Sequence, residues 1–72
     1  MPDIYYACRR KNELNHLYID ATTISPTIEE TTVKANEKDR QWPGFAKEHP
    51  IIDIIPVKFN ALDEIVPINA GD

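Results

Sequence analysis

The stretch that decides the fold is Ile51-Ile52-Asp53-Ile54-Ile55-Pro56-Val57-Lys58-Phe59, the densest run of strand-forming residues in the chain. Its apolar side chains fall on both faces, as they do in a strand that lies inside a sheet. Pro56 has no N–H to donate to a neighbouring strand, which is typical of an edge strand or a strand end. We therefore predict a strand over residues 51–55 with a bend at Pro56.

Two shorter segments near the N-terminus have the composition of strands. Residues 4–8 are rich in strand formers, and residues 15–21 alternate apolar and polar side chains. The stretch between them, residues 9–14, is polar. Two such segments joined by a short polar connection indicate an antiparallel hairpin.

A helix is predicted to follow this hairpin. Ser25 before Pro26 places a capping residue ahead of a proline at the first helical position, where its missing N–H costs nothing. Thr27 with Glu30 forms an alternative capping box. Both starting points stay open.

The predicted helix has a thin apolar stripe. Helical spacing places Ile28, Ala35 and Trp42 on one side, and Pro43-Gly44 ends the helix. We expect Trp42 to close the core between helix and sheet, while a loop beginning at Trp42 could also contact a partner. Residues 45–49 have room for one further helical turn.

The fold class follows from these elements. Residues 61–68 fit a short fourth strand or a helical turn. We expect residues 1–68 to form a single α+β domain, with a three- to four-stranded sheet covered by one helix, and residues 69–72 to be frayed. Such a sheet leaves one face and its edges for dimerisation or for a partner.

Composition narrows the classes of function. The chain has 72 residues, a formal net charge of -4 and a single cysteine. An acidic domain repels nucleic-acid phosphate, so nucleic acid is a disfavoured partner. No apolar run approaches the ~20 residues of a membrane span, and a lone cysteine suits the reducing cytosol. We expect a cytoplasmic protein without membrane contact.

The residues that carry chemistry do not form a recognisable catalytic or metal-binding pattern. Cys8 is predicted to be a small buried residue of a strand; the alternative is a nucleophile for which His16, placed across the hairpin, acts as the base. His16 and His49 lack the paired spacing of zinc ligands. We therefore expect no enzyme activity, no cofactor and no bound metal.

Aromatic side chains next to cations are the best candidates for a binding surface. Tyr5 and Tyr6 precede the only basic cluster, Arg9-Arg10-Lys11, a combination that also suits nucleic acid. The residues that we expect to contact a protein partner are Tyr5, Arg9, Arg10, Lys11, Tyr18, Trp42 and Phe45.

About half of the chain is similar in outline to the small podophage inhibitors of bacterial RNA polymerase. The pieces that carry this resemblance are Thr27–Glu30, Trp42, Pro43-Gly44-Phe45 and Ile54-Ile55-Pro56. The resemblance implies a phage- or mobile-element-encoded protein that inhibits or modulates a larger host complex by occupying its surface. The alternatives are a nucleic-acid-binding accessory protein and a homodimer that has a structural role or sequesters a small ligand between its subunits.

Overall fold

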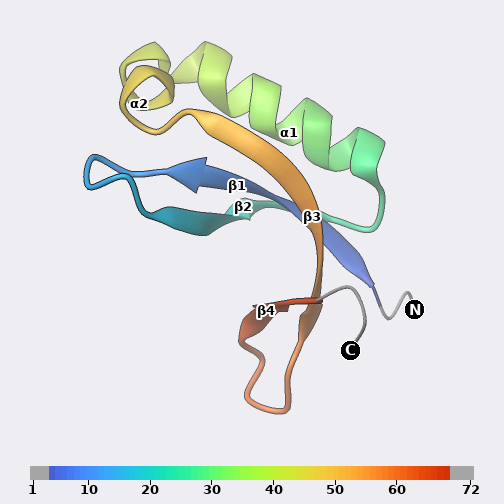
Figure 1. Ribbon diagram of the computed structural model, residues 1–72. Coiled ribbons are helices and arrows are strands. Elements are labelled where there is room, and N and C mark those ends of the chain that lie inside the picture. The colour runs from blue at the N-terminus through green and yellow to red at the C-terminus, as the bar shows by residue number, and fades with distance from the viewer. Residues whose placement is uncertain (1–3, 69–72) are drawn as a thin grey trace.

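A computed structural model describes residues 4–68 of the chain, so the predicted frayed tail, residues 69–72, lies outside the described residues (Figure 1). Four strands and two helices follow one another in the order expected for the predicted α+β class. They are β1 (Tyr5–Lys11), β2 (Leu17–Ser25), α1 (Ile28–Gln41), α2 (Pro43–Glu48), β3 (Ile51–Phe59) and β4 (Ile65–Pro67).

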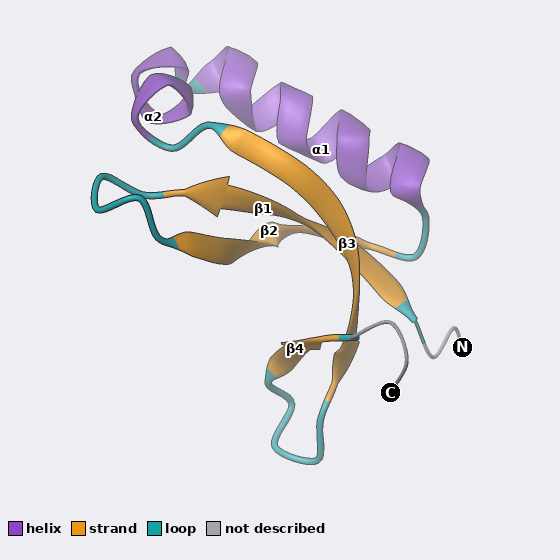
Figure 2. Cartoon of the chain, in the orientation of Figure 1, coloured by secondary structure: helices purple, strands orange, loops and turns teal. Residues whose placement is uncertain are grey.

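The four strands form one antiparallel sheet in the order β2-β1-β3-β4. Helix α1 covers one face of this sheet, and the sheet curls so that β4 lies on the opposite side from α1 (Figure 2). The prediction of a small sheet with one covering helix is confirmed. The short helix α2 contains most of the predicted extra helical turn of residues 45–49, but it begins at Pro43 and ends at Glu48, so Pro43 and Gly44 are helical. Residues 65–67 adopt the strand alternative.

Strand β3 does not end at Pro56, so the predicted limit of 51–55 is wrong. Pro56 pairs with Tyr6 of β1, and its carbonyl accepts a hydrogen bond from the N–H of Ile68, at 3.1 Å. The N–H and C=O of one strand residue point to the same side, so the missing donor lies on the β4 side. Because β4 ends at Pro67, the proline falls where that ladder stops. A central strand therefore tolerates it.

Helix α1 begins at the second of the two predicted positions. Thr27 is the capping residue, and its hydroxyl accepts a hydrogen bond from the N–H of Glu30. Ser25, the other candidate, belongs to β2. Its hydroxyl donates to the carbonyl of Thr27 and lies 2.6 Å from the hydroxyl of Thr31. The serine therefore attaches the helix to the sheet rather than capping it.

Only Ala35 of the predicted stripe lies on the buried side of α1. Thr31 and Ala35 are buried, whereas Ile28 and Trp42 are 51% and 62% exposed. The hydroxyl of Thr31 donates to the carbonyl of Tyr6 in β1. The helix is oriented by polar contacts with the sheet, which turn its largest apolar side chains toward solvent.

Both hairpins close with the same five-residue turn, which joins β1 to β2 and β3 to β4. In each turn the side chain of an asparagine, Asn12 or Asn60, accepts backbone hydrogen bonds from the residues two and four positions later. In each, the fourth residue has a positive φ, 63° at Asn15 and 59° at Asp63. Asparagine and aspartate tolerate this conformation better than most residues. Residues 9–11, predicted as part of the first connection, belong to β1.

Candidate functional site

The sheet face that α1 leaves uncovered carries a groove whose lining residues are mostly apolar. The groove has a volume of about 440 Å³. Strands β2 and β4 form its walls, and β1 and β3 form its floor, because the curl of the sheet brings the two outer strands toward each other (Figure 1). The lining residues are Arg9, Leu17, Tyr18, Ile19, Ile55, Ile65 and Pro67.

Arg9 is the cation of this groove, and it is paired with Asp53. Arg9 Nε lies 2.7 Å and Nη2 2.5 Å from the two carboxylate oxygens of Asp53, which faces it across the β1–β3 pair. These hydrogen bonds hold the pKa of Asp53 below its ordinary value and raise that of Arg9. Both side chains are partly exposed, at 33% and 40%. The groove therefore combines apolar walls with a bidentate ion pair on its floor.

Arg10 lies on the opposite face of β1 and is fully buried beneath α1. Its Nε donates to Asp20 at 2.7 Å, and its Nη1 donates to Asp39 and to the carbonyl of His49. Nη2 has no hydrogen-bond partner among residues 4–68, and the guanidinium carbon lies 4.8 Å from the centre of the Phe45 ring. That distance is within the range of a cation–π contact.

Asp20 is the centre of this buried network. Burial favours its neutral form, but hydrogen bonds from Thr22, Lys38 and Arg10 outweigh burial and lower its pKa from 3.8 to about 2. The ammonium of Lys38 lies 3.0 Å from one carboxylate oxygen of Asp20. Arg10, which was expected at a partner surface, thus makes its contacts inside the protein. The basic cluster divides between the two faces of the sheet because successive strand residues alternate.

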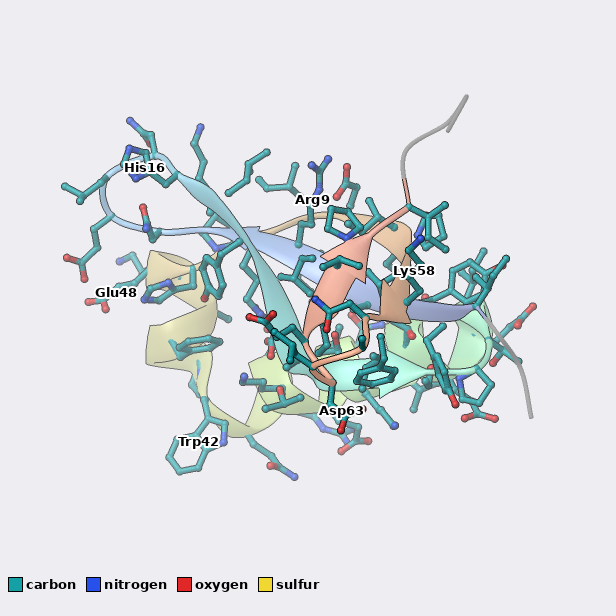
Figure 3. All side chains as sticks on the ribbon, turned by 90° about the horizontal axis from the view of Figure 1, so that it is seen from below. Arg9, His16, Trp42, Glu48, Lys58 and Asp63 are labelled. Carbon is teal, nitrogen blue, oxygen red and sulfur yellow. The ribbon has the colours of Figure 1, made fainter. Side chains whose placement is uncertain are left out.

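The other predicted binding residues lie in separate places. Tyr5 packs edge-on against Phe59, with ring centres 5.4 Å apart, at the far end of the sheet from Trp42. Lys11 ends β1, next to the first turn. Trp42, expected to close the core, instead stands at the corner between α1 and α2 and points away from the body of the protein (Figure 3). The structure does not bring the predicted set together on one surface.

Tyr18 and Phe45 meet at His49. The Tyr18 hydroxyl lies 3.1 Å from His49 Nδ1, and the Phe45 ring stacks on the imidazole with centres 4.8 Å apart. The same Phe45 ring lies beneath Lys38, whose ammonium is 4.6 Å from its centre. These two aromatic residues hold the junction between α2 and β3 rather than presenting a flat surface.

Cys8 is fully buried, as predicted, on the helix-covered face. Burial raises the pKa of its thiol, while a contact with Thr23 acts in the opposite direction. A protonated, enclosed thiol is a poor nucleophile. Its backbone N–H donates to the Thr23 hydroxyl at 3.0 Å, where a bulge interrupts the β1–β2 ladder.

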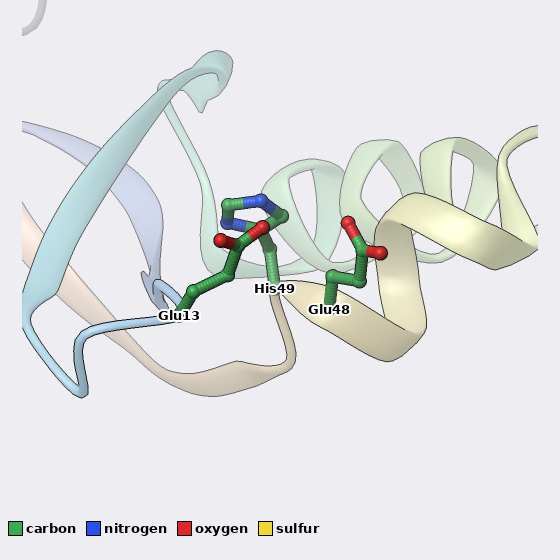
Figure 4. A group of neighbouring side chains, drawn as sticks. All are labelled: Glu13, Glu48 and His49. Atoms are coloured by element: carbon green, nitrogen blue, oxygen red, sulfur yellow. The ribbon is translucent and has the colours of Figure 1, made fainter.

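One group of side chains outside the groove combines metal-ligand chemistry. Glu13, Glu48 and His49 place one potential ligand atom each within 4.8 Å of one another (Figure 4). Beside them is a hollow of about 300 Å³, lined by residues 12–14 and His49. Of the three residues, the sequence drew attention only to His49.

Two of the groove residues, Arg9 and Tyr18, belong to the predicted binding set. The aliphatic ones were missed because they are far apart in sequence. Leu17 and Ile19 lie on β2, Ile55 on β3, and Ile65 and Pro67 on β4. The sequence signal that could have found them is the alternation of apolar side chains along the strands. The apolar side of residues 15–21 and the Ile55 side of β3 both point away from α1. Sequence alone does not tell which side the helix covers.

No protein-family model, no curated protein and no solved structure matches the chain. Within residues 4–68, no helix has the length and apolar character needed to cross a membrane. The outline resemblance to podophage inhibitors of RNA polymerase therefore stays a prediction.

Proposed function

We propose that this protein is a non-enzymatic binding module that modulates a larger protein by receiving an apolar segment of that protein in the groove. The observation that carries the proposal is the apolar groove on the uncovered sheet face. Buried apolar contact supplies most of the free energy of protein association, and a groove concentrates it.

The composition of the groove indicates what kind of segment fits. Apart from Tyr18, the walls are aliphatic, and the floor carries one ion pair whose charges are already matched. A segment that places aliphatic side chains against Leu17 and Ile65 would bury them without leaving an unpaired charge. A strongly charged partner would meet no unpaired countercharge among the lining residues, because Arg9 is already paired with Asp53. We therefore favour an extended apolar segment of a protein over nucleic acid.

The burial of Arg10 also weighs against nucleic acid. Phosphate contacts need free cations on one surface, but Arg9 pairs with Asp53 and Arg10 is enclosed.

The proposal includes a bacterial complex as the partner because of the outline resemblance to podophage inhibitors of RNA polymerase. The experiment therefore searches for the partner in a bacterial lysate.

The test compares a groove variant with a matched surface variant. Leu17→Glu introduces a charge into the groove at a residue that is 48% exposed, and Leu62→Glu makes the same change at the exposed tip of the second turn. A partner captured from the lysate by the wild-type chain is purified and its affinity for each variant is measured. We expect Leu17→Glu to weaken binding at least about tenfold and Leu62→Glu to leave it unchanged. Equal affinity for both variants would overturn the proposal.

A second copy of the chain is the alternative occupant, because β2 is an edge strand beside the groove. Part of that edge is already occupied, since Lys34 Nζ donates to the carbonyl of Ile24 at 2.8 Å. Sedimentation equilibrium separates the two cases. A wild-type dimer that Leu17→Glu dissociates would show that the groove serves self-association instead.

A further inference from the structure

Three side chains that are distant in sequence converge at the end of the molecule near the first turn. Glu13 comes from the turn between β1 and β2, Glu48 from the last residue of α2, and His49 from the residue that follows (Figure 4). One oxygen of each carboxylate and one ring nitrogen lie within 4.8 Å of one another. Two carboxylates and an imidazole are a ligand set that zinc and related ions accept.

The imidazole of His49 is held in place before any ion arrives. Tyr18 engages its Nδ1 at 3.1 Å, and Phe45 stacks on one side of the ring. Arg10 donates to the His49 carbonyl at 2.9 Å, so the backbone is fixed as well. Metal-binding histidines characteristically use one ring nitrogen for such an orienting hydrogen bond and the other for the ion. The contact with Tyr18 leaves Nε2 as the nitrogen that can coordinate.

The two carboxylates are available and close to coordinating distance. Neither Glu13 nor Glu48 forms an ion pair with another residue in the described range 4–68, and both are exposed. Ligands bound at about 2.1 Å in a tetrahedral site are about 3.4 Å from one another. The present spacing of up to 4.8 Å must therefore contract by about 1 Å or more. Rotation of exposed glutamate side chains provides that movement without a change in the backbone.

We propose that Glu13, Glu48 and His49 bind a divalent transition-metal ion of the zinc class, with water completing its coordination. The imidazole favours Zn²⁺ or Co²⁺ over Mg²⁺ and Ca²⁺, which prefer oxygen ligands. The bound ion joins the first turn to the end of α2, two segments that the sequence separates by 35 positions. This site lies outside the groove and does not depend on the function proposed for it.

The protein offers a matched way to remove one ligand. The second turn has the same hydrogen bonds as the first, and it carries Ala61 where the first carries Glu13. Glu13→Ala therefore removes a carboxylate at a position where alanine is known to fit this turn. Glu48→Gln removes the second charge, and Glu29→Gln, on the exposed side of α1, is the control.

The experiment titrates the full-length chain with ZnCl₂ by isothermal calorimetry. We expect one ion per chain, with Glu13→Ala and Glu48→Gln each weakening binding by about tenfold or more and Glu29→Gln leaving it unchanged. The other histidine, His16, is tested with His16→Gln, which we expect to leave the affinity unchanged. Equal affinity for all variants, or loss of binding in His16→Gln alone, would overturn the proposal.

A second measurement locates the ion. Co²⁺ is added to the ¹⁵N-labelled chain, and its paramagnetic effects on the amide signals are mapped by NMR. We expect the affected amides to be those of residues 12–14 and 47–49, on the two sides of the site. Effects centred on His16 or on the chain termini would show adventitious binding and contradict the assignment.

Discussion

The two faces of the sheet are stabilised by different chemistry. Beneath α1, Cys8 and Ala35 are accompanied by a buried arginine, an aspartate and several hydroxyls, whereas the uncovered face buries Ala7 and Val57 and carries the groove. Sequence reasoning usually places the helix over the more apolar face of a sheet. Here the helix is held by directional hydrogen bonds and ion pairs, and the face with the aliphatic groove residues remains accessible. This difference teaches that burial under a helix does not identify the apolar side of a small sheet.

Removing the charge of Asp20 is expected to destabilise the helix-covered side of the protein more than any other change considered below. Asp20→Asn leaves the buried guanidinium of Arg10 with Asp39 as its remaining carboxylate. Loss of one partner of a buried ion pair destabilises proteins by about 3–5 kcal/mol, and we expect about 3 kcal/mol here. Urea unfolding followed by circular dichroism measures the loss in the free energy of unfolding.

The matched control for this change is Asp53→Asn, which breaks the partly exposed pair with Arg9 on the other face. Exposed pairs contribute little, so its effect should be far smaller than that of Asp20→Asn. Similar effects of the two variants would show that the buried network has no special role in stability.

Acid should weaken the same network without a substitution. The folded pKa of Asp20 is lowered from 3.8 to about 2, so its contribution is fully present above about pH 4 and is lost as the pH falls toward 2. Asp53, whose pKa is also lowered, contributes in the same direction. Wild-type stability should therefore decrease over this range, measured by urea unfolding at successive pH values. Asp20→Asn should show a shallower decrease, and an identical pH dependence would contradict the assignment.

On the uncovered face, the expected effect of a core truncation is intermediate. Val57→Ala removes two methyl groups from a side chain that has no exposed surface, and we expect a loss of about 2 kcal/mol in the free energy of unfolding. Ile28→Ala, on the half-exposed side of α1, is the control and should cost less. A larger loss of stability for Ile28→Ala than for Val57→Ala would indicate that Ile28 belongs to the core, as the predicted apolar stripe requires.

The smallest expected effect concerns Trp42. Because the side chain is 62% exposed, Trp42→Ser should change the free energy of unfolding by less than about 0.5 kcal/mol. The wild-type fluorescence should be that of a hydrated indole and should be quenched readily by iodide. A blue-shifted, protected emission would indicate that Trp42 closes the core after all.

Much of the fold could be predicted from the sequence, because local patterns fix local structure. The hairpin, the Thr27 capping box, the extra turn after Pro43 and the Ile51 strand each depend on neighbouring residues. The predictions of strand limits and of buried residues were wrong where a tertiary contact determined the structure. Pro56 is tolerated because β4 stops beside it, and Trp42 is exposed because polar residues of α1 have partners on the sheet.

The candidate sites were less accessible from the sequence. Alternation placed Arg9 and Arg10 on opposite faces, but it did not show that Asp20 would enclose one and Asp53 would pair with the other. The Glu13, Glu48 and His49 group depends on how the first turn meets the end of α2. Contacts between such distant segments are determined by strand order and sheet curl, which no local sequence pattern encodes.

The recurrence of one turn at both hairpins has a consequence for molecular recognition. Each tip presents a leucine in the third position, Leu14 and Leu62, which are 73% and 79% exposed. The molecule therefore displays two nearly equivalent short epitopes on different loops. Their polar flanks differ, since Glu13 and His16 on one tip correspond to Ala61 and Glu64 on the other. A binder raised against the shared backbone shape would cross-react between the tips, and only the flanking side chains would let it tell them apart.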